Sequence, residues 1–124
     1  MNVAFDFSNR VVIVTGGARG IGRAMVHRFA GSGARVLTAD RDAEGLAETV
    51  ANLDPERIVS LVADVSTEDG AHAIVAETLA RFGTLDVCVN NAAVAPHADL
   101  FDERVEVWDT IYGVNTRGPF LMTR

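Results

Sequence analysis

The sequence has 124 residues, of which 48% are hydrophobic and 23% charged, a composition typical of a single globular domain. The formal net charge is −6, and the eleven basic residues are arginines scattered along the chain. Nucleic acid and anionic membrane surfaces are therefore unfavourable partners, because binding to phosphates is driven by clustered cations. Without a long apolar run, a signal core or a second cysteine beside Cys88, the sequence predicts a cytoplasmic protein without membrane contact.

Four short apolar runs alternate with segments of helical periodicity. The runs predict strands over residues 10–15, 35–39, 58–63 and 85–90. Helices are predicted from Gly20 to Gly31 or Gly33, over residues 42–52, from a cap at Ser66 or Thr67 to Gly83, and from about Asp102 to the last residue. This alternation, with short connections, is typical of a parallel sheet covered by helices on both faces. We therefore expect an α/β fold with a Rossmann-type doubly wound parallel sheet of about four strands and four helices.

Glycines follow the first predicted strand in the segment Thr15–Gly22, with the spacing G-x-x-x-G-x-G. Here Gly16 permits a tight turn, Gly20 lets the main chain approach a phosphate, and Gly22 removes a side chain where helix and strand pack closely. Free N–H groups and the helix dipole at the start of the next helix attract a diphosphate. A P-loop is excluded, because no lysine follows the glycines.

An acidic residue, Asp40, ends the second predicted strand, eighteen positions after Gly22. A carboxylate at this point accepts hydrogen bonds from the adenosine ribose and repels a 2′-phosphate, which favours NAD over NADP as cofactor. Arg19 and Arg41 lie near the expected place of a 2′-phosphate and partly offset this repulsion. The alternative is that Asp40 caps the next helix or forms a turn, as Asp commonly does after a strand.

These residues resemble the short-chain dehydrogenase/reductase family, whose motif T-G-x-x-x-G-x-G matches Thr15–Gly22 in full. Three further segments are similar to family motifs: Asp64-Val65, the run Asn90-Asn91-Ala92-Ala93, and Val114–Gly118, which matches V-N-x-x-G. Ala93 departs from the glycine that the family has at this place. The resemblance implies a cofactor site formed by Gly16, Arg19, Gly20, Ile21, Gly22, Asp40, Arg41, Asp64, Val65, Asn90 and Ala92. It also implies a catalytic role for Asn115, which would bind a water molecule in the proton relay.

The catalytic Tyr-x-x-x-Lys pair of the family has no counterpart in this sequence. The single tyrosine, Tyr112, is followed four positions later by Thr116, and the chain contains no lysine. Without a neighbouring cation, a phenol with a pKa of about 10 is a poor proton donor at neutral pH, so we expect Tyr112 to be a packing residue. Trp108, with Val105, Ile111 and Tyr112, is expected to pack the last helix; the resemblance also implies a dimer contact through this helix as an alternative. Residues 1–124 are therefore expected to be an incomplete NAD(P)-binding domain that lacks the C-terminal catalytic half.

The predicted function is the cofactor-binding half of an NAD(H)-dependent oxidoreductase whose full-length parent acts on a small-molecule alcohol or carbonyl substrate. The family also implies a homo-oligomer in the parent. Two alternatives stay open: a non-catalytic dinucleotide-binding or interaction module, and a methyltransferase-like fold with a similar glycine turn. No metal site is expected, because His27, His72 and His97 show no ligand spacing.

Overall fold

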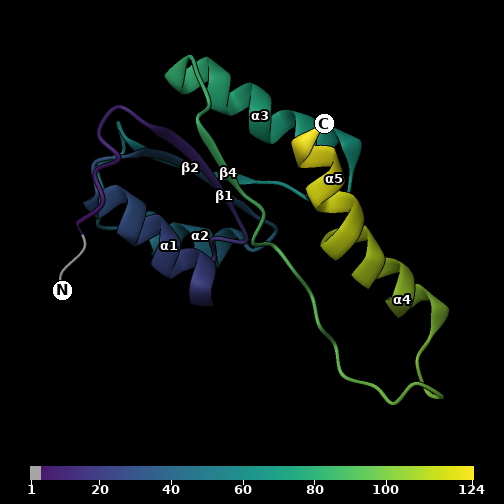
Figure 1. Cartoon of the computed structure of the whole chain (residues 1–124). Coiled ribbons are helices and arrows are strands. Elements are labelled where there is room, and N and C mark those ends of the chain that lie inside the picture. Colours follow the sequence, from purple (N-terminus) through teal and green to yellow (C-terminus); the bar gives the residue numbers. More distant parts are fainter. Residues whose placement is uncertain (1–3) are drawn as a thin grey trace.

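The computed structural model describes residues 4–124, which form a parallel four-stranded sheet in the order β3-β2-β1-β4 with helices on both faces (Figure 1). The strands are β1 (Val11–Thr15), β2 (Arg35–Asp40), β3 (Ile58–Val62) and β4 (Val87–Val89). The helices are α1 (Gly20–Gly31), α2 (Ala43–Val50), α3 (Glu68–Phe82), α4 (Val105–Tyr112), the π-helix η1 (Gly113–Arg117) and α5 (Gly118–Thr123). The predicted doubly wound α/β fold is confirmed.

Strand β1 separates two hydrophobic cores, because successive residues of a strand point to opposite faces of a sheet. Val12 and Val14 pack with Val26 of α1, on the face that α1 and α2 cover (Figure 1). Ile13 packs on the other face with Ile74 of α3, where α5 also lies. Both faces of β1 are therefore buried, which explains its almost continuous run of β-branched residues.

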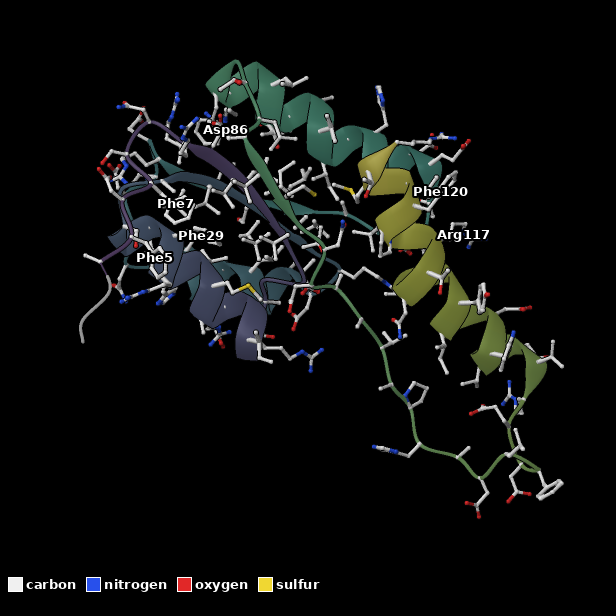
Figure 2. All side chains as sticks on the ribbon, in the orientation of Figure 1. Phe5, Phe7, Phe29, Asp86, Arg117 and Phe120 are labelled. Carbon is white, nitrogen blue, oxygen red and sulfur yellow. The ribbon has the colours of Figure 1, made fainter. Side chains whose placement is uncertain are left out.

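The amino-terminal edge of the sheet is closed by contacts of Phe7 and Asp86, both labelled in Figure 2. The Phe7 ring packs edge-on against Phe29 of α1, with 4.9 Å between ring centroids. The carboxylate of Asp86 accepts a hydrogen bond from the Val11 N–H at 2.8 Å and pairs with Arg10 at 3.2 Å. These contacts cover the end of the sheet where the strands begin. The other end, where the strands terminate, is where a cavity can form.

The last helical segment differs from the single helix predicted from Asp102. It begins at Val105 and changes to π-helical geometry over Gly113–Arg117 before continuing as α5. Pro119 explains the change, because it has no N–H to donate to the carbonyl of Asn115, as an α-helix requires. Strand β4 is also shorter than predicted, covering Val87–Val89.

The prediction that Trp108 and Tyr112 pack the last helix is wrong for contacts within this chain. Both side chains lie on the outside of α4, with 57% and 55% of their surface exposed, and they stack on each other with 6.0 Å between ring centroids. Helix α4 has no buried residue, in agreement with its position away from the sheet in Figure 1. The sequence pattern identified an apolar helix face but not what covers it.

Candidate functional site

A cavity of about 570 Å³ opens at the carboxyl ends of the strands. It is lined by the turn after β1, the start of α1, the ends of β2 and β3, the loop after β4, and η1. In open parallel sheets, ligands bind at this edge, where the strand order reverses. The lining residues are Gly16, Arg19, Ile21, Gly22, Ala39, Asp40, Arg41, Asp42, Ala63, Asp64, Val65, Asn91, Ala92, Ala93, Val94 and Val114.

The glycine-rich turn, residues 16–19, connects β1 to α1 and requires glycine for two different reasons. Gly16 has a φ of +73°, a conformation that residues with a Cβ rarely adopt. At Gly22, in the first turn of α1, an added Cβ would lie 1.9 Å from the carbonyl oxygen of Gly16. Both roles agree with the predicted tight turn and close packing. Above Gly20, by contrast, an added Cβ would meet nothing within 4 Å, so that side of the turn is open.

The loop after β4 contributes Asn91, and not the predicted Asn90, to the residues that line the cavity. The Nδ2 of Asn91 donates to the carbonyl oxygens of Thr15 (3.1 Å) and Gly16 (3.2 Å). Asn90 is exposed, and its side chain reaches Thr123 at 3.5 Å, outside the residues that line the cavity. Both asparagines lie beyond the end of β4, and of the two it is Asn91 whose side chain bonds to the glycine-rich turn. The sequence motif contains both asparagines but does not show which of the two lines the cavity.

Asp40 ends β2 at the wall of the cavity, as predicted. Its Oδ2 accepts a hydrogen bond from the Ala18 N–H, and its Oδ1 accepts one from the Asp42 N–H, both at 3.1 Å. The cap of α2 is Asp42, which accepts from the Gly45 N–H at 3.0 Å. Asp40 therefore does not cap α2. Its carboxylate joins the end of β2 to the glycine-rich turn and still presents lone pairs to the cavity.

Two arginines and an apolar side chain form the outer part of the wall. Arg19 and Arg41 are exposed there, and Arg41 Nε lies 3.9 Å from Asp64 Oδ2. Ile21, one of the residues expected at the cofactor site, is 73% exposed and lines the cavity. The wall thus combines cations and an apolar surface beside the carboxylates of Asp40 and Asp64.

Asp64 lies after β3 at the far end of the cavity. Partial burial raises its pKa, but hydrogen bonds from the Oγ and N–H of Ser66, together with the charges of Arg41 and Arg117, outweigh burial and lower the pKa below its ordinary value. The next residue, Val65, is 7% exposed and packs in the core. Asp64 is therefore charged at neutral pH, and Val65 can face a ligand chiefly through its backbone.

Asn115 lies in η1, beside the cavity but not among its lining residues. Its Oδ1 accepts from the Val94 N–H and its Nδ2 donates to the Val94 carbonyl, both at 2.8 Å. The side chain thus connects η1 to the loop after β4. Each amide atom retains one further hydrogen-bonding site, and the binding of a relay water stays a prediction.

The donor set fits a dinucleotide better than a metal ion. The first N–H groups of a helix have no partner within the helix, and those of α1 open beside the cavity, where they favour an anionic diphosphate. Within residues 4–124, no group of three or more His, Cys, Asp or Glu side chains is arranged to bind a metal. Fold and site together define a nucleotide-binding domain of the Rossmann class.

In the same part of the chain, none of the helices has the length and apolarity needed to cross a bilayer.

Comparison with known proteins identifies the family within this class. Residues 10–124 match the family model described as short chain dehydrogenase, so the chain belongs to the short-chain dehydrogenase/reductase family. The 2-(R)-hydroxypropyl-CoM dehydrogenase of Xanthobacter autotrophicus is 38% identical over 122 residues, covering 94% of this chain and 49% of that protein. The methyltransferase-like alternative is thereby excluded.

Two solved structures from Brucella melitensis have the same fold. One, described as a short-chain dehydrogenase/reductase and glucose/ribitol dehydrogenase, has a TM-score of 0.93 and 36% identity, covering 97% of this chain and 52% of that one. The other is a 3-ketoacyl-(acyl-carrier-protein) reductase complexed with NADH, with a TM-score of 0.90 and 33% identity, covering 96% and 49%. The chain spans about half the length of the curated relatives it matches.

Proposed function

We propose that this chain binds NAD(H) in preference to NADP(H) in the cavity and serves as the cofactor-binding half of an alcohol/carbonyl oxidoreductase. The observation that supports the preference is the position of Asp40, whose carboxylate lines the cavity next to the glycine-rich turn. A carboxylate there accepts ribose hydroxyls and repels a 2′-phosphate. The exposed Arg19 and Arg41 attract a 2′-phosphate, so the preference for NAD(H) over NADP(H) is moderate.

The chemistry proposed for the whole protein is hydride transfer between nicotinamide C4 and a carbinol or carbonyl carbon of a small molecule. The residues of this chain bind and orient the cofactor, which is the protein's share in such chemistry. The role of Asn115 in a proton relay, a homo-oligomeric state and a cytoplasmic location remain predictions. An apolar surface with Val105 and Trp108 exposed on α4 supports an oligomer.

A dinucleotide-binding module without catalysis is the second candidate, and it is favoured by the absence of lysine from the sequence. Both candidates predict cofactor binding. They differ in the turnover of the full-length parent: a catalytic parent oxidises NADH when carbonyl compounds are supplied, and a parent that is only a binding module does not.

Calorimetric titration of the chain with NADH and with NADPH tests the proposal. We expect the wild type to bind NADH more tightly, and Asp40→Asn, which keeps the size of the side chain and removes its charge, to lower the NADH/NADPH affinity ratio roughly tenfold. Glu44→Gln is the matched control, because Glu44 is an exposed acid on α2 that does not line the cavity. Equal affinities in the wild type, or an unchanged ratio in Asp40→Asn, would contradict the preference; binding of neither nucleotide would contradict the function.

A further inference from the structure

Arg23 lies near the start of α1, but its side chain is directed toward α2 and not into the cavity. Its Nε donates to Thr49 Oγ1 at 3.0 Å, and its Nη2 contacts the carbonyl oxygens of Ala18 and Gly45 and the carboxylate of Glu48, the last at 2.9 Å. Three of these partners belong to α2, and the fourth, Ala18, belongs to the glycine-rich turn. One guanidinium therefore connects the turn to a helix that does not itself line the cavity.

Thr49 makes a second connection between the same two elements. Its side chain is 1% exposed, and its hydroxyl accepts the hydrogen bond from Arg23. The hydroxyl has a single proton to donate and two acceptors within reach, the carbonyl of Gly17 at 2.8 Å and the carbonyl of Gly45 at 2.9 Å. Two consecutive carbonyl groups of the turn, those of Gly17 and Ala18, are thus bound to side chains that do not line the cavity.

The peptide groups of the turn have little freedom to move away from these partners. The Ala18 N–H donates to the Asp40 carboxylate and the Ala18 carbonyl accepts from Arg23, so both polar backbone groups of Ala18 have side-chain partners. An added Cβ at Gly17 would lie 1.7 Å from Thr38 Oγ1, which shows how closely the turn contacts β2. An added Cβ at Gly45 would lie 2.8 Å from the Ala18 carbonyl oxygen, so α2 approaches the turn only because residue 45 is glycine.

We infer that Arg23 and Thr49 are positioning residues for the cofactor, which set the conformation of the glycine-rich turn from α2. The inference rests on the proposed function, because the turn matters for binding only if it receives the diphosphate. Charge-assisted hydrogen bonds are the strongest of those that bind the turn, so Arg23 contributes more than the neutral contacts. Its exposed partner Glu48 contributes little, because surface ion pairs are weak.

Arg23→Met tests the inference, because methionine keeps the aliphatic stem and removes the guanidinium. Amide hydrogen exchange of the cofactor-free chain, followed by NMR, is expected to accelerate at Ala18 and to stay unchanged at Val12 and Val14 in the centre of the sheet. Binding of NADH is expected to weaken roughly 10- to 100-fold, the loss that corresponds to one hydrogen bond to a charged group. Thr49→Val is expected to change both quantities in the same direction, by less.

Two further variants separate positioning from other effects. Arg28→Met makes the same substitution on the exposed side of α1, where Arg28 has no side-chain partner among the described residues, and should change neither quantity. Arg23→Lys keeps the charge but cannot bridge all four partners, so it should restore NADH affinity only in part. Full restoration would show that Arg23 acts through its charge alone and would overturn the inference.

The exchange measurement keeps the inference separate from the proposed function. If the wild type binds neither NADH nor NADPH, the proposed function fails, while faster exchange confined to Ala18 in Arg23→Met still supports positioning of the turn. If the wild type binds NADH and Arg23→Met exchanges and binds like the wild type, the inference fails. Acceleration at Ala18, Val12 and Val14 alike would also overturn it, because that result indicates a loss of global stability only.

Discussion

The Nδ2 atom of Asn91 lies 3.2 Å from the carbonyl oxygen of Gly16, so the loop that follows β4 binds the turn that follows β1. The same amide reaches the Thr15 carbonyl, and the Thr15 hydroxyl accepts the N–H groups of Asn91 and Ala92, both at 3.1 Å. Asn91 thus bonds both to the end of β1 and to a residue that lines the cavity, so the same side chain stabilises the sheet and the cavity wall.

Replacing Asn91 by alanine should destabilise the fold and weaken cofactor binding together. The change removes two donors from partly buried carbonyl groups, which is expected to lower the free energy of unfolding by about 1–3 kcal/mol. Asn90→Ala is the matched comparison and should cost less than about 0.5 kcal/mol, because the Asn90 side chain is exposed. Urea unfolding and NADH titration measure both effects; a larger loss for Asn90→Ala would contradict the assignment.

Gly22→Ala should prevent the turn from packing on α1. The added methyl group would lie 1.9 Å from the Gly16 carbonyl oxygen, so either the turn or the helix must move, at a cost of about 3 kcal/mol or more. Gly31→Ala adds the same methyl group to open space in the same helix and should raise stability by about 0.5–1 kcal/mol. Thermal unfolding of the two variants is expected to shift in opposite directions. Similar shifts would show that the close approach at Gly22 does not exist.

The fold should lose stability in acid through Asp86. A hydrogen bond from the Val11 N–H, aided by Arg10 and opposed by slight desolvation, lowers the pKa of Asp86 below its ordinary value. A lowered pKa in the folded state means that the charged form stabilises the fold above the unfolded pKa of about 3.9, and that this stability is lost as pH falls below that value.

The melting temperature between pH 6 and pH 2.5 checks this expectation. Asp86→Asn should melt lower than the wild type near pH 6 and approach it in acid, because the amide cannot lose a charge. Asp99→Asn, in the exposed loop before α4, should follow the wild-type curve. Parallel curves for Asp86→Asn and the wild type would contradict the assignment.

Asn115→Ala should release the loop after β4 from η1. Both hydrogen bonds to the Val94 backbone are lost, and amide exchange at Val94 should accelerate while unfolding stability falls by only about 1 kcal/mol, because the site is partly open to solvent. Thr116→Ala, at the neighbouring exposed position, serves as the control. Unchanged exchange at Val94 would show that Asn115 does not connect the two segments.

Features that depend on a few adjacent residues could be predicted from the sequence alone. Thr67 caps α3 and Gly83 ends it with a φ of +77°, because capping and left-handed turns depend on local side chains and backbone sterics. The glycine spacing and Asp40 identified the carboxyl-terminal edge of the sheet as the site, because in a parallel sheet all strand ends meet there.

Tertiary structure alone decided which side chains meet across that edge. Asn91 rather than Asn90 faces the turn, and Tyr112 is exposed, because each outcome depends on how one element is rotated against another. Arg23 looks like any polar residue of an amphipathic helix until α2, twenty-six residues further along the chain at Thr49, is packed beside it. Hydrogen bonds between distant segments have no signal in a local pattern, since their partners become neighbours only when the chain has folded.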